Sequence, residues 1–191
     1  PERRAFLRRL ARRTWAYFER YAGAEQNWLP ADNFQEYPEA RLAERTSPTN
    51  MGLALLAQVA AHDFGYQSPR RMVERVRNVL GSMEGLRRYR GHFLNWYGTR
   101  ERQPLAPLYV STVDSGNLAA HLIVLRGALE ELLDAPVLPV CWQEGLEDAG
   151  CLDRLRQFGE FRVRETLAGL SLVGFDLLDG DHLDLLSRAA G

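Results

Sequence analysis

The sequence predicts an all-α fold in which helical hairpins stack side by side. Segments with one apolar stripe and one charged face alternate along the chain with segments that are apolar almost all round. No segment shows the patterning that is typical of strands and hairpins. The helical alternation is typical of stacked hairpins in which one helix of each pair faces inward, as in an α-solenoid or a closed α/α toroid. Because no fixed-period repeat is found, we favour the toroid.

The first predicted helix spans residues 2–21 and is amphipathic. Its apolar residues recur at helical spacing, and its arginines and glutamates fall elsewhere on the wheel. The residues expected to face the core are Leu7, Leu10, Thr14, Phe18 and Tyr21. Residues 23–46 follow as a long connection with two prolines and no sustained period, so we expect irregular structure there.

Two Ser-Pro pairs predict the starts of the next two helices. Ser47 is expected to cap a helix whose first turn holds Pro48, where the missing N–H does no harm. The body of this helix, 49–64, is apolar almost all round and is expected inside the molecule. Ser68 and Pro69 repeat the signal before a helix with an apolar stripe and an arginine-rich face, which we expect to be outer and half-exposed.

A second polar and aromatic connection, residues 89–112, precedes another apolar helix, Leu118 to Leu133. Thr112 or Asp114 is expected to cap that helix. Beyond it the helical pattern continues less clearly. Shorter helices are predicted at 140–149, 152–158, 162–178 and 182–190.

The composition predicts a globular chain of one domain, or a piece of a larger protein. The chain has 191 residues, of which 46% are apolar and 26% charged, with a net charge of -1. No run of apolar residues is long enough to cross a bilayer, and no signal peptide is visible. Because the chain opens directly into an arginine-rich helix, we expect it to be cut from inside a longer protein.

Charge and cysteine usage disfavour several kinds of site. All 24 basic residues are arginine, but 25 acidic residues balance them, and nucleic-acid binding needs a net basic face. Cys141 and Cys151 lack neighbours at zinc spacing and are expected to be free thiols in a reducing compartment. The histidines share no ligand spacing either, so no metal site is predicted.

The two connections, residues 23–46 and 89–112, carry aromatic side chains beside polar ones. Each leads into the N-terminus of a predicted inner helix, so parallel inner helices would bring both to the mouth of one cavity. Aromatic rings offer apolar faces to pyranoses, and a few placed polar groups bind hydroxyls. The aromatic candidates are Trp28, Trp96, Tyr97 and Tyr109, and the polar candidates are Asp32, Asn33, Gln35, Arg45, Asn50, Arg90, His92, Asn95, Asp114 and Asn117. These residues predict a carbohydrate-binding cleft.

Structural roles compete with binding roles at several of these positions. Asp32 and Asn33 are also suited to an Asx turn after Pro30. Asp114 is also suited to a helix cap. A lone histidine such as His92 is more often a hydrogen-bonded structural residue than a catalyst.

Five motifs follow one another along the chain: NWLPADNFQE, RTSPTNMGLALL, AAHDFGY, YRGHFLNWYGTR and PLYVSTVDSGNLA. Together they resemble the bacterial cyclic β-1,2-glucan synthases, most strongly over residues 13–133. The sequence departs from the family pattern at Ala31, Leu94 and Gly98, where a proline, an aromatic residue and an aspartate are usual. The resemblance implies that residues 1–191 are a single fragment, the N-terminal portion of the middle (α/α)6, glycoamylase-like domain of these enzymes.

The resemblance also implies an activity for the full-length synthases, which we call the parent enzymes. They are inner-membrane proteins in which a glycosyltransferase part builds linear β-1,2-glucan from UDP-glucose. A phosphorylase-like part trims that glucan, and the middle domain closes it into a ring by transglycosylation. This fragment is then expected to line the glucan-binding cleft on the cytoplasmic side and to need no cofactor of its own.

Ring closure favours a retaining route with two carboxylates. Asp32, Glu36 and Asp114 are the carboxylates nearest the expected cleft, but the family layout implies that the main acids lie beyond Gly191. The isolated fragment is therefore expected to be inactive. Two alternatives stay open, namely a β-1,2-glucan hydrolase domain and a non-catalytic helical interaction module.

The expected partners are the β-1,2-glucan chain and the remaining domains of the parent enzyme. Without those domains the inner helices would expose apolar surface, so dimerisation through these faces is also expected. Neither nucleic-acid binding nor direct membrane insertion by the fragment is expected.

Overall fold

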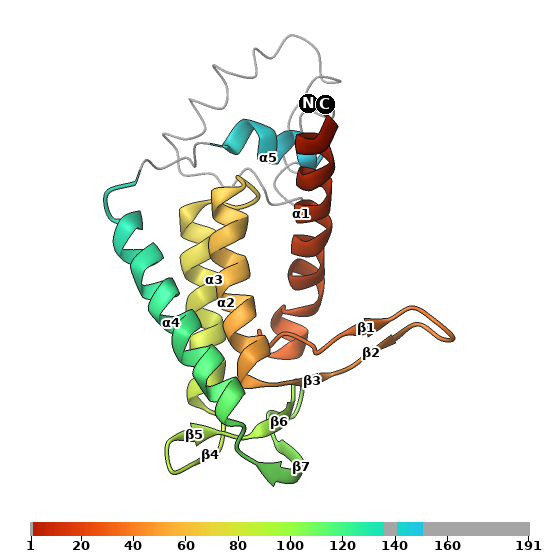
Figure 1. Cartoon of the computed structure of the whole chain (residues 1–191), viewed down its shortest axis with the longest axis vertical. Coiled ribbons are helices and arrows are strands. Elements are labelled where there is room, and N and C mark those ends of the chain that lie inside the picture. The colour runs from red at the N-terminus through yellow and green to blue at the C-terminus, as the bar shows by residue number, and fades with distance from the viewer. Residues whose placement is uncertain (1, 136–140, 151–191) are drawn as a thin grey trace, which may run out of the picture.

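The computed structural model describes residues 2–135 and 141–150, and helices dominate them (Figure 1). The helices are α1 (Glu2–Tyr21), α2 (Pro48–Asp63), α3 (Pro69–Glu84), α4 (Thr112–Leu132) and α5 (Trp142–Asp148), with a short 3-10 helix at Ala24–Gln26. The helices α1 to α4 run lengthwise along the molecule, and α2 packs against both α3 and α4. The helix-rich fold that the sequence predicts is confirmed. Closure into a toroid stays a prediction.

Two of the predicted helix starts are confirmed by their caps. The N–H of Asn50 donates to Ser47 Oγ (3.2 Å), and the N–H of Arg71 donates to Ser68 Oγ (3.2 Å). Each cap satisfies one of the N–H groups that a helix start leaves without an intrahelical acceptor. The Ser-Pro pairs are therefore reliable local signals in this chain.

The predicted start of α4 is wrong. Ser111 caps this helix, because its Oγ accepts the N–H of Asp114 at 3.1 Å. Thr112 is the first helical residue, and Asp114 lies in the first turn. The spacing Ser111-x-x-Asp114 is that of a capping box, with the acidic residue three positions after the cap.

Seven short strands correct the prediction that strands are absent. They are β1 (Phe34–Gln35), β2 (Arg41–Leu42), β3 (Arg45–Thr46), β4 (Arg88–Tyr89), β5 (His92–Phe93), β6 (Asn95–Gly98) and β7 (Pro104–Tyr109). They form two hairpins, β1-β2 and β4-β5, and one three-stranded antiparallel sheet in the order β3-β6-β7. All of them lie at the end of the molecule where α2 and α4 begin (Figure 1). We call this the strand end.

The buried face of α1 differs from the predicted one. Leu7 and Leu10 are 61% and 51% exposed, whereas Trp15 is 4% exposed and packs with Phe18 against α2. Arg8 turns inward and pairs with Asp148 of α5 at 2.8 Å. A tryptophan buries far more apolar area than a leucine, so the face of α1 that carries Trp15 packs against the core.

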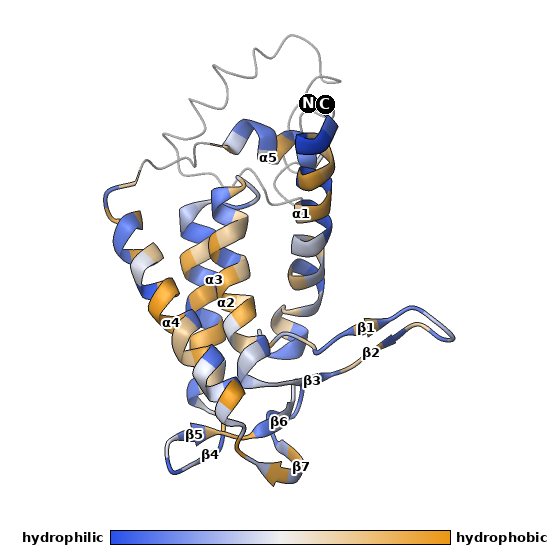
Figure 2. Cartoon of the chain, viewed as in Figure 1, coloured by the Kyte–Doolittle hydropathy of each residue, from blue (hydrophilic) through white to orange (hydrophobic). Residues whose placement is uncertain are grey.

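The two helices predicted to be inner differ in exposure. Half of the 16 residues of α2 are buried, and Met51 and Leu55 are 0% exposed. In α4 only Leu118 and Leu125 are buried, while Ile123 is 73% exposed. Figure 2 shows mainly apolar residues along both helices, so α4 presents an unpartnered apolar face among the described residues.

The helix predicted at 140–149 is confirmed as α5. The helices predicted at 152–158, 162–178 and 182–190, and the thiol predicted at Cys151, lie outside the described residues.

Candidate functional site

The three-stranded sheet brings the starts of α2 and α4 together. Strand β3 runs directly into the cap of α2, β7 leads into α4, and both pair with β6. The two helices run in the same direction from the strand end (Figure 1). The two helix starts are in contact, because Asn117 Nδ2 in the second turn of α4 donates to Thr49 Oγ1 in the first turn of α2 at 3.1 Å. Parallel inner helices are the condition under which the sequence analysis brings the two connections together, and α2 and α4 meet it.

Asp32 is the centre of a polar cluster beside the start of α2. Its Oδ2 accepts Nε and Nη2 of Arg45 at 3.2 and 3.1 Å, and Nδ2 of Asn33 at 3.1 Å. Its Oδ1 accepts Nδ2 of Asn50, also at 3.1 Å. The Arg45 side chain is 49% exposed and that of Asp32 is 17% exposed. The cluster therefore presents hydrogen-bonding groups at the surface in a fixed arrangement.

Trp96 adds an aromatic face to this cluster. The guanidinium carbon of Arg45 lies 4.7 Å from the centroid of the Trp96 ring, a cation–π distance. Trp96 is half-buried. Residues from three separate segments, Asp32, Arg45 and Trp96, thus meet in one place.

Asp114 lies in the first turn of α4, where its carboxylate is a second polar centre. Partial burial acts to raise the pKa of Asp114, but side-chain hydrogen bonds from Ser111, Thr49, Ser47 and Asn95 outweigh it and lower the pKa. Hydrogen bonds to the charged form favour that form. The lowered pKa keeps the carboxylate ionised at neutral pH, so Asp114 is a poor proton donor.

Two of the predicted ligand contacts, Tyr97 and Asn95, are buried in the structure. Tyr97 is 0% exposed, and its hydroxyl donates to the carbonyl of Arg87 (2.6 Å) and accepts the N–H of Leu94 (2.8 Å). Burial is the main cause that raises the pKa of Tyr97. Asn95 is 2% exposed. Tyr97 belongs to the hydrophobic core, and Asn95 is a buried polar residue of β6.

Four further candidates lie apart from the Asp32 cluster. Trp28 packs against the hydrophobic core, with the Arg75 guanidinium 5.9 Å from its ring centroid. Gln35 pairs with Arg41 in the β1-β2 hairpin. Arg90 and His92 are exposed on the β4-β5 hairpin, which projects on another side of the strand end (Figure 1).

Tyr109 ends β7, the strand that pairs with β6. It is 45% exposed at the end of β7, where it pairs with Asn95 of β6. Sequence reasoning missed Ser111, whose Oγ accepts the N–H of Asp114, and Thr49, whose Oγ1 accepts Nδ2 of Asn117. The capping-box spacing at 111–114 is the signal that could have identified Ser111.

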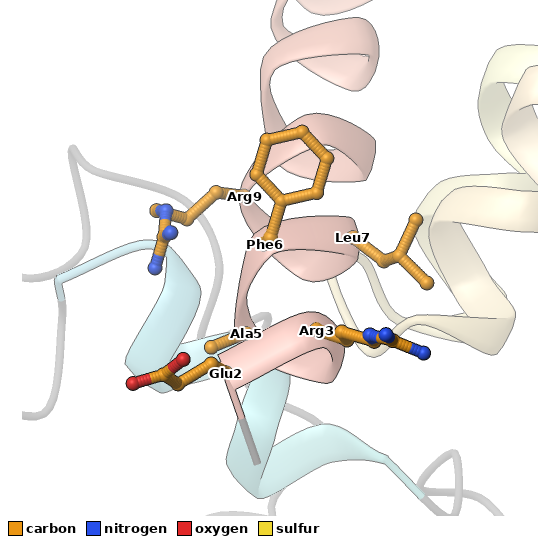
Figure 3. Close-up of a pocket in the computed structure, with 6 residues that line it drawn as sticks. All are labelled: Glu2, Arg3, Ala5, Phe6, Leu7 and Arg9. Atoms are coloured by element: carbon orange, nitrogen blue, oxygen red, sulfur yellow. The ribbon is translucent and has the colours of Figure 1, made fainter.

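Two hollows lie elsewhere on the described surface. One follows the first turns of α1, where the side chains of Phe6, Leu7 and Arg9 spread around a single helix (Figure 3). The other lies between α3 and α4 and includes Val73 and Leu129. Neither contains a predicted site residue, and the described residues hold no group of three or more potential metal ligands.

Comparison with known proteins identifies a relative for most of the chain. A stretch of 130 residues is 49% identical to the cyclic beta-(1,2)-glucan synthase NdvB of Rhizobium meliloti (strain 1021). The stretch makes up 68% of this chain, and the chain spans about 5% of the length of that curated relative. No family model matches the chain.

Among solved structures, a Bacteroides fragilis NCTC 9343 protein provisionally assigned as a glucoamylase matches with a TM-score of 0.49 and 21% identity, over 64% of this chain and 33% of its own. Of the described helices, none is long and apolar enough to cross a membrane. The similarity to cyclic β-1,2-glucan synthases that the five motifs indicate is confirmed, over 68% of the chain.

Proposed function

We propose that this chain is part of a glucan-cyclising enzyme and that its strand end binds a β-1,2-glucan chain. The observation that carries the proposal is the meeting of Asp32, Arg45, Asn50 and Trp96 beside the starts of two parallel helices. The identity to a cyclic β-(1,2)-glucan synthase supports the choice of glucan.

The chemistry of the cluster suits a sugar. Hydroxyl groups of a pyranose both donate and accept hydrogen bonds, and Asp32, Arg45 and Asn50 offer acceptors and donors within one site. The indole of Trp96 and the phenol ring of Tyr109 supply apolar surface for the C–H faces of the ring. Because one face of Trp96 is covered by Arg45, a sugar stacks on the other face or displaces the guanidinium.

In the parent enzyme this chain would form the N-terminal portion of an (α/α)6 toroid that cyclises linear β-1,2-glucan by transglycosylation. Such a reaction needs one carboxylate as nucleophile and another as acid/base. Asp114 stays ionised and Asp32 is tied to three neighbours, so both suit orientation of a substrate better than proton transfer. The catalytic pair then belongs to later parts of the parent chain, on the cytoplasmic side of the inner membrane.

Titration of the 191-residue chain with linear β-1,2-glucan, followed by tryptophan fluorescence, tests the proposal. We expect saturable binding to this glucan and none to linear β-1,3-glucan of equal length. Trp96→Ala should weaken binding at least about tenfold, because an aromatic contact contributes on the order of 1 kcal/mol beyond its buried area. Phe6→Ala, at the far end of α1, is the matched control and should bind normally. Equal affinity for both glucans, or normal binding by Trp96→Ala, would refute the proposal.

A further inference from the structure

Arg45 and Trp96 are diagonal neighbours on one face of the three-stranded sheet. Strand β3 pairs with β6 so that Arg45 is opposite Gly98 and Thr46 is opposite Tyr97. Side chains two residues apart along a strand share a face, so Trp96 lies on the same face as Arg45. The other face carries Thr46 and Tyr97, which are both 0% exposed. Strand pairing thus brings the guanidinium over the indole, with its carbon 4.7 Å from the ring centroid.

Asp32 holds the guanidinium of Arg45 in this place. Oδ2 of Asp32 accepts both Nε and Nη2 of Arg45, at 3.2 and 3.1 Å. The same oxygen accepts Nδ2 of Asn33, and Oδ1 accepts Nδ2 of Asn50 in the first turn of α2, each at 3.1 Å. A carboxylate that is fixed in this way holds its cation in one direction through charge-assisted hydrogen bonds. Contacts from Asn50 to Asp32 to Arg45 therefore connect the start of α2 to the Trp96 ring.

Displacing the guanidinium from Trp96 would break more than the cation–π contact. The Asp32 side chain is only 17% exposed, and a mostly buried carboxylate that loses its cation keeps its desolvation cost without the compensating charge. Trp96 is half-buried with the guanidinium in place, so part of it is open to a ligand beyond Arg45. A sugar that uses this open part leaves the pair of Asp32 and Arg45 intact.

We propose that Arg45 is a positioning residue that stays on one face of Trp96 and fixes the orientation of the ring, while the glucan binds the surface of Trp96 that Arg45 leaves open. The part that concerns the glucan rests on the proposed function above. The part that concerns the ring rests on the contacts among Asp32, Arg45 and Trp96. The guanidinium is therefore not displaced when the sugar binds.

Arg45→Met is the sharpest substitution, because it keeps an unbranched apolar stem and removes the planar charged group. The indole N–H of Trp96 is observed in a proton–nitrogen correlation spectrum of the full chain and is assigned with Trp96→Phe. Without ligand we expect its resonance to shift and its heteronuclear NOE to fall in Arg45→Met, since the ring loses the group that holds it. The indole of Trp15, whose ring centroid lies 5.6 Å from the Arg75 guanidinium, is the internal reference and should not change.

Arg88→Met is the matched control. The Arg88 guanidinium lies 4.3 Å from the centroid of the Phe93 ring, in the β4-β5 hairpin at the same end of the molecule. The substitution removes an arginine that also covers an aromatic ring, but outside the Asp32 cluster. The Trp96 resonance and the glucan affinity should both stay as in the unsubstituted chain.

Calorimetric titration with linear β-1,2-glucan shows whether Arg45 acts through Trp96. Arg45→Met should weaken binding at least about threefold, which corresponds to the loss of one exposed cation–π contact. In the Trp96→Ala background the same substitution should change the affinity less than about 1.5-fold, because the ring that Arg45 positions is gone. Effects that add in full mean direct contact of Arg45 with the sugar and overturn the positioning role. Tighter binding by Arg45→Met means that the guanidinium competes with the sugar, and it overturns the role as well.

The resonances and the affinities separate this proposal from the proposed function. If the unsubstituted chain binds no glucan, the proposed function fails together with the glucan part of this proposal, and the Trp96 resonance in Arg45→Met still decides whether Arg45 positions the ring. An unchanged resonance and NOE overturn the positioning role at any affinity. A changed resonance with unchanged affinity overturns the glucan part. Arg45→Gln, which is neutral and shorter, gives the same test should Arg45→Met fail to fold.

Discussion

Gly52 marks a close approach between α2 and α4. A Cβ atom at this position would overlap the imidazole of His121, which lies on the facing side of α4. The glycine is therefore required by space and not by backbone conformation. Gly52 lies in the second turn of α2 and His121 in the third turn of α4, so the two helices stay close beyond their first turns.

Gly52→Ala should lower the free energy of unfolding by about 1–3 kcal/mol, the usual result of overpacking. Gly81→Ala is the control within a neighbouring helix, because nothing lies within 4 Å of the added atom. That variant should be up to about 1 kcal/mol more stable, since alanine favours helices over glycine. Urea unfolding followed by circular dichroism compares the two, and equal stabilities would contradict the close approach.

Tyrosine ionisation should weaken the fold at high pH. Burial is the largest cause that raises the pKa of Tyr17 and of Tyr66, each to about 12 from 10.0. A raised pKa favours the protonated phenol in the folded state. The resulting stabilisation is complete below pH 10 and is lost as pH rises toward 12.

Unfolding free energies measured at pH 9, 10, 11 and 12 test this expectation, with stability expected to fall over the range between the unfolded and folded pKa values. Tyr66→Phe should lose less stability between pH 10 and pH 12, because one of the tyrosines with a raised pKa is gone. An identical pH profile in that variant would contradict the assignment.

At the scale of elements, the predictions that depend on local sequence were the most accurate. Ser47 and Ser68, each followed directly by a proline, predict the starts of α2 and α3. The structure confirms both starts. The face of α1 depends instead on what packs against it, and there the leucine stripe was the wrong choice. The strands were missed because they are two to six residues long, too short for a pattern to emerge.

The same distinction applies to the candidate site. The adjacency of Asp32, Arg45 and Asn50 followed from the expectation that connections meet at the starts of parallel helices. The buried positions of Asn95 and Tyr97 did not follow, because they result from a strand the sequence analysis lacked. In β6, Trp96 is half-buried, whereas Asn95 and Tyr97 on either side of it are buried. Recognition of that strand would have predicted that Trp96 is more exposed than Tyr97.

The cap of α3 offers a test of an element far from the site. Ser68→Ala removes the acceptor for the N–H of Arg71 and should cost about 1 kcal/mol of stability. Because α3 begins at the end opposite the strands (Figure 1), glucan affinity should not change. A thermal melt measures the stability and a glucan titration measures the affinity, both on one preparation. A loss of affinity would show that the start of α3 is coupled to the strand end.

At the scale of the whole molecule, the apolar face of α4 needs a partner. Val113 and Ile123 are 70% and 73% exposed, and exposed apolar patches of this kind favour association. We expect the chain to self-associate as its concentration rises, and Ile123→Glu to keep it monomeric. Sedimentation velocity over a range of concentrations measures this. A chain that stays monomeric throughout would contradict the expectation.

The β1-β2 hairpin leaves the molecule between two residues of the candidate site and returns to it. Its base is closed where the N–H of Asp32 donates to the carbonyl of Ala43 (3.0 Å) and the N–H of Ala43 to that of Asn33 (2.9 Å). Because the base is closed independently of the tip, the length and sequence of residues 36–39 are free to vary. Such tips tolerate inserted sequence well, so a fluorescent label or an affinity tag could be attached there without disturbing Asp32 and Arg45.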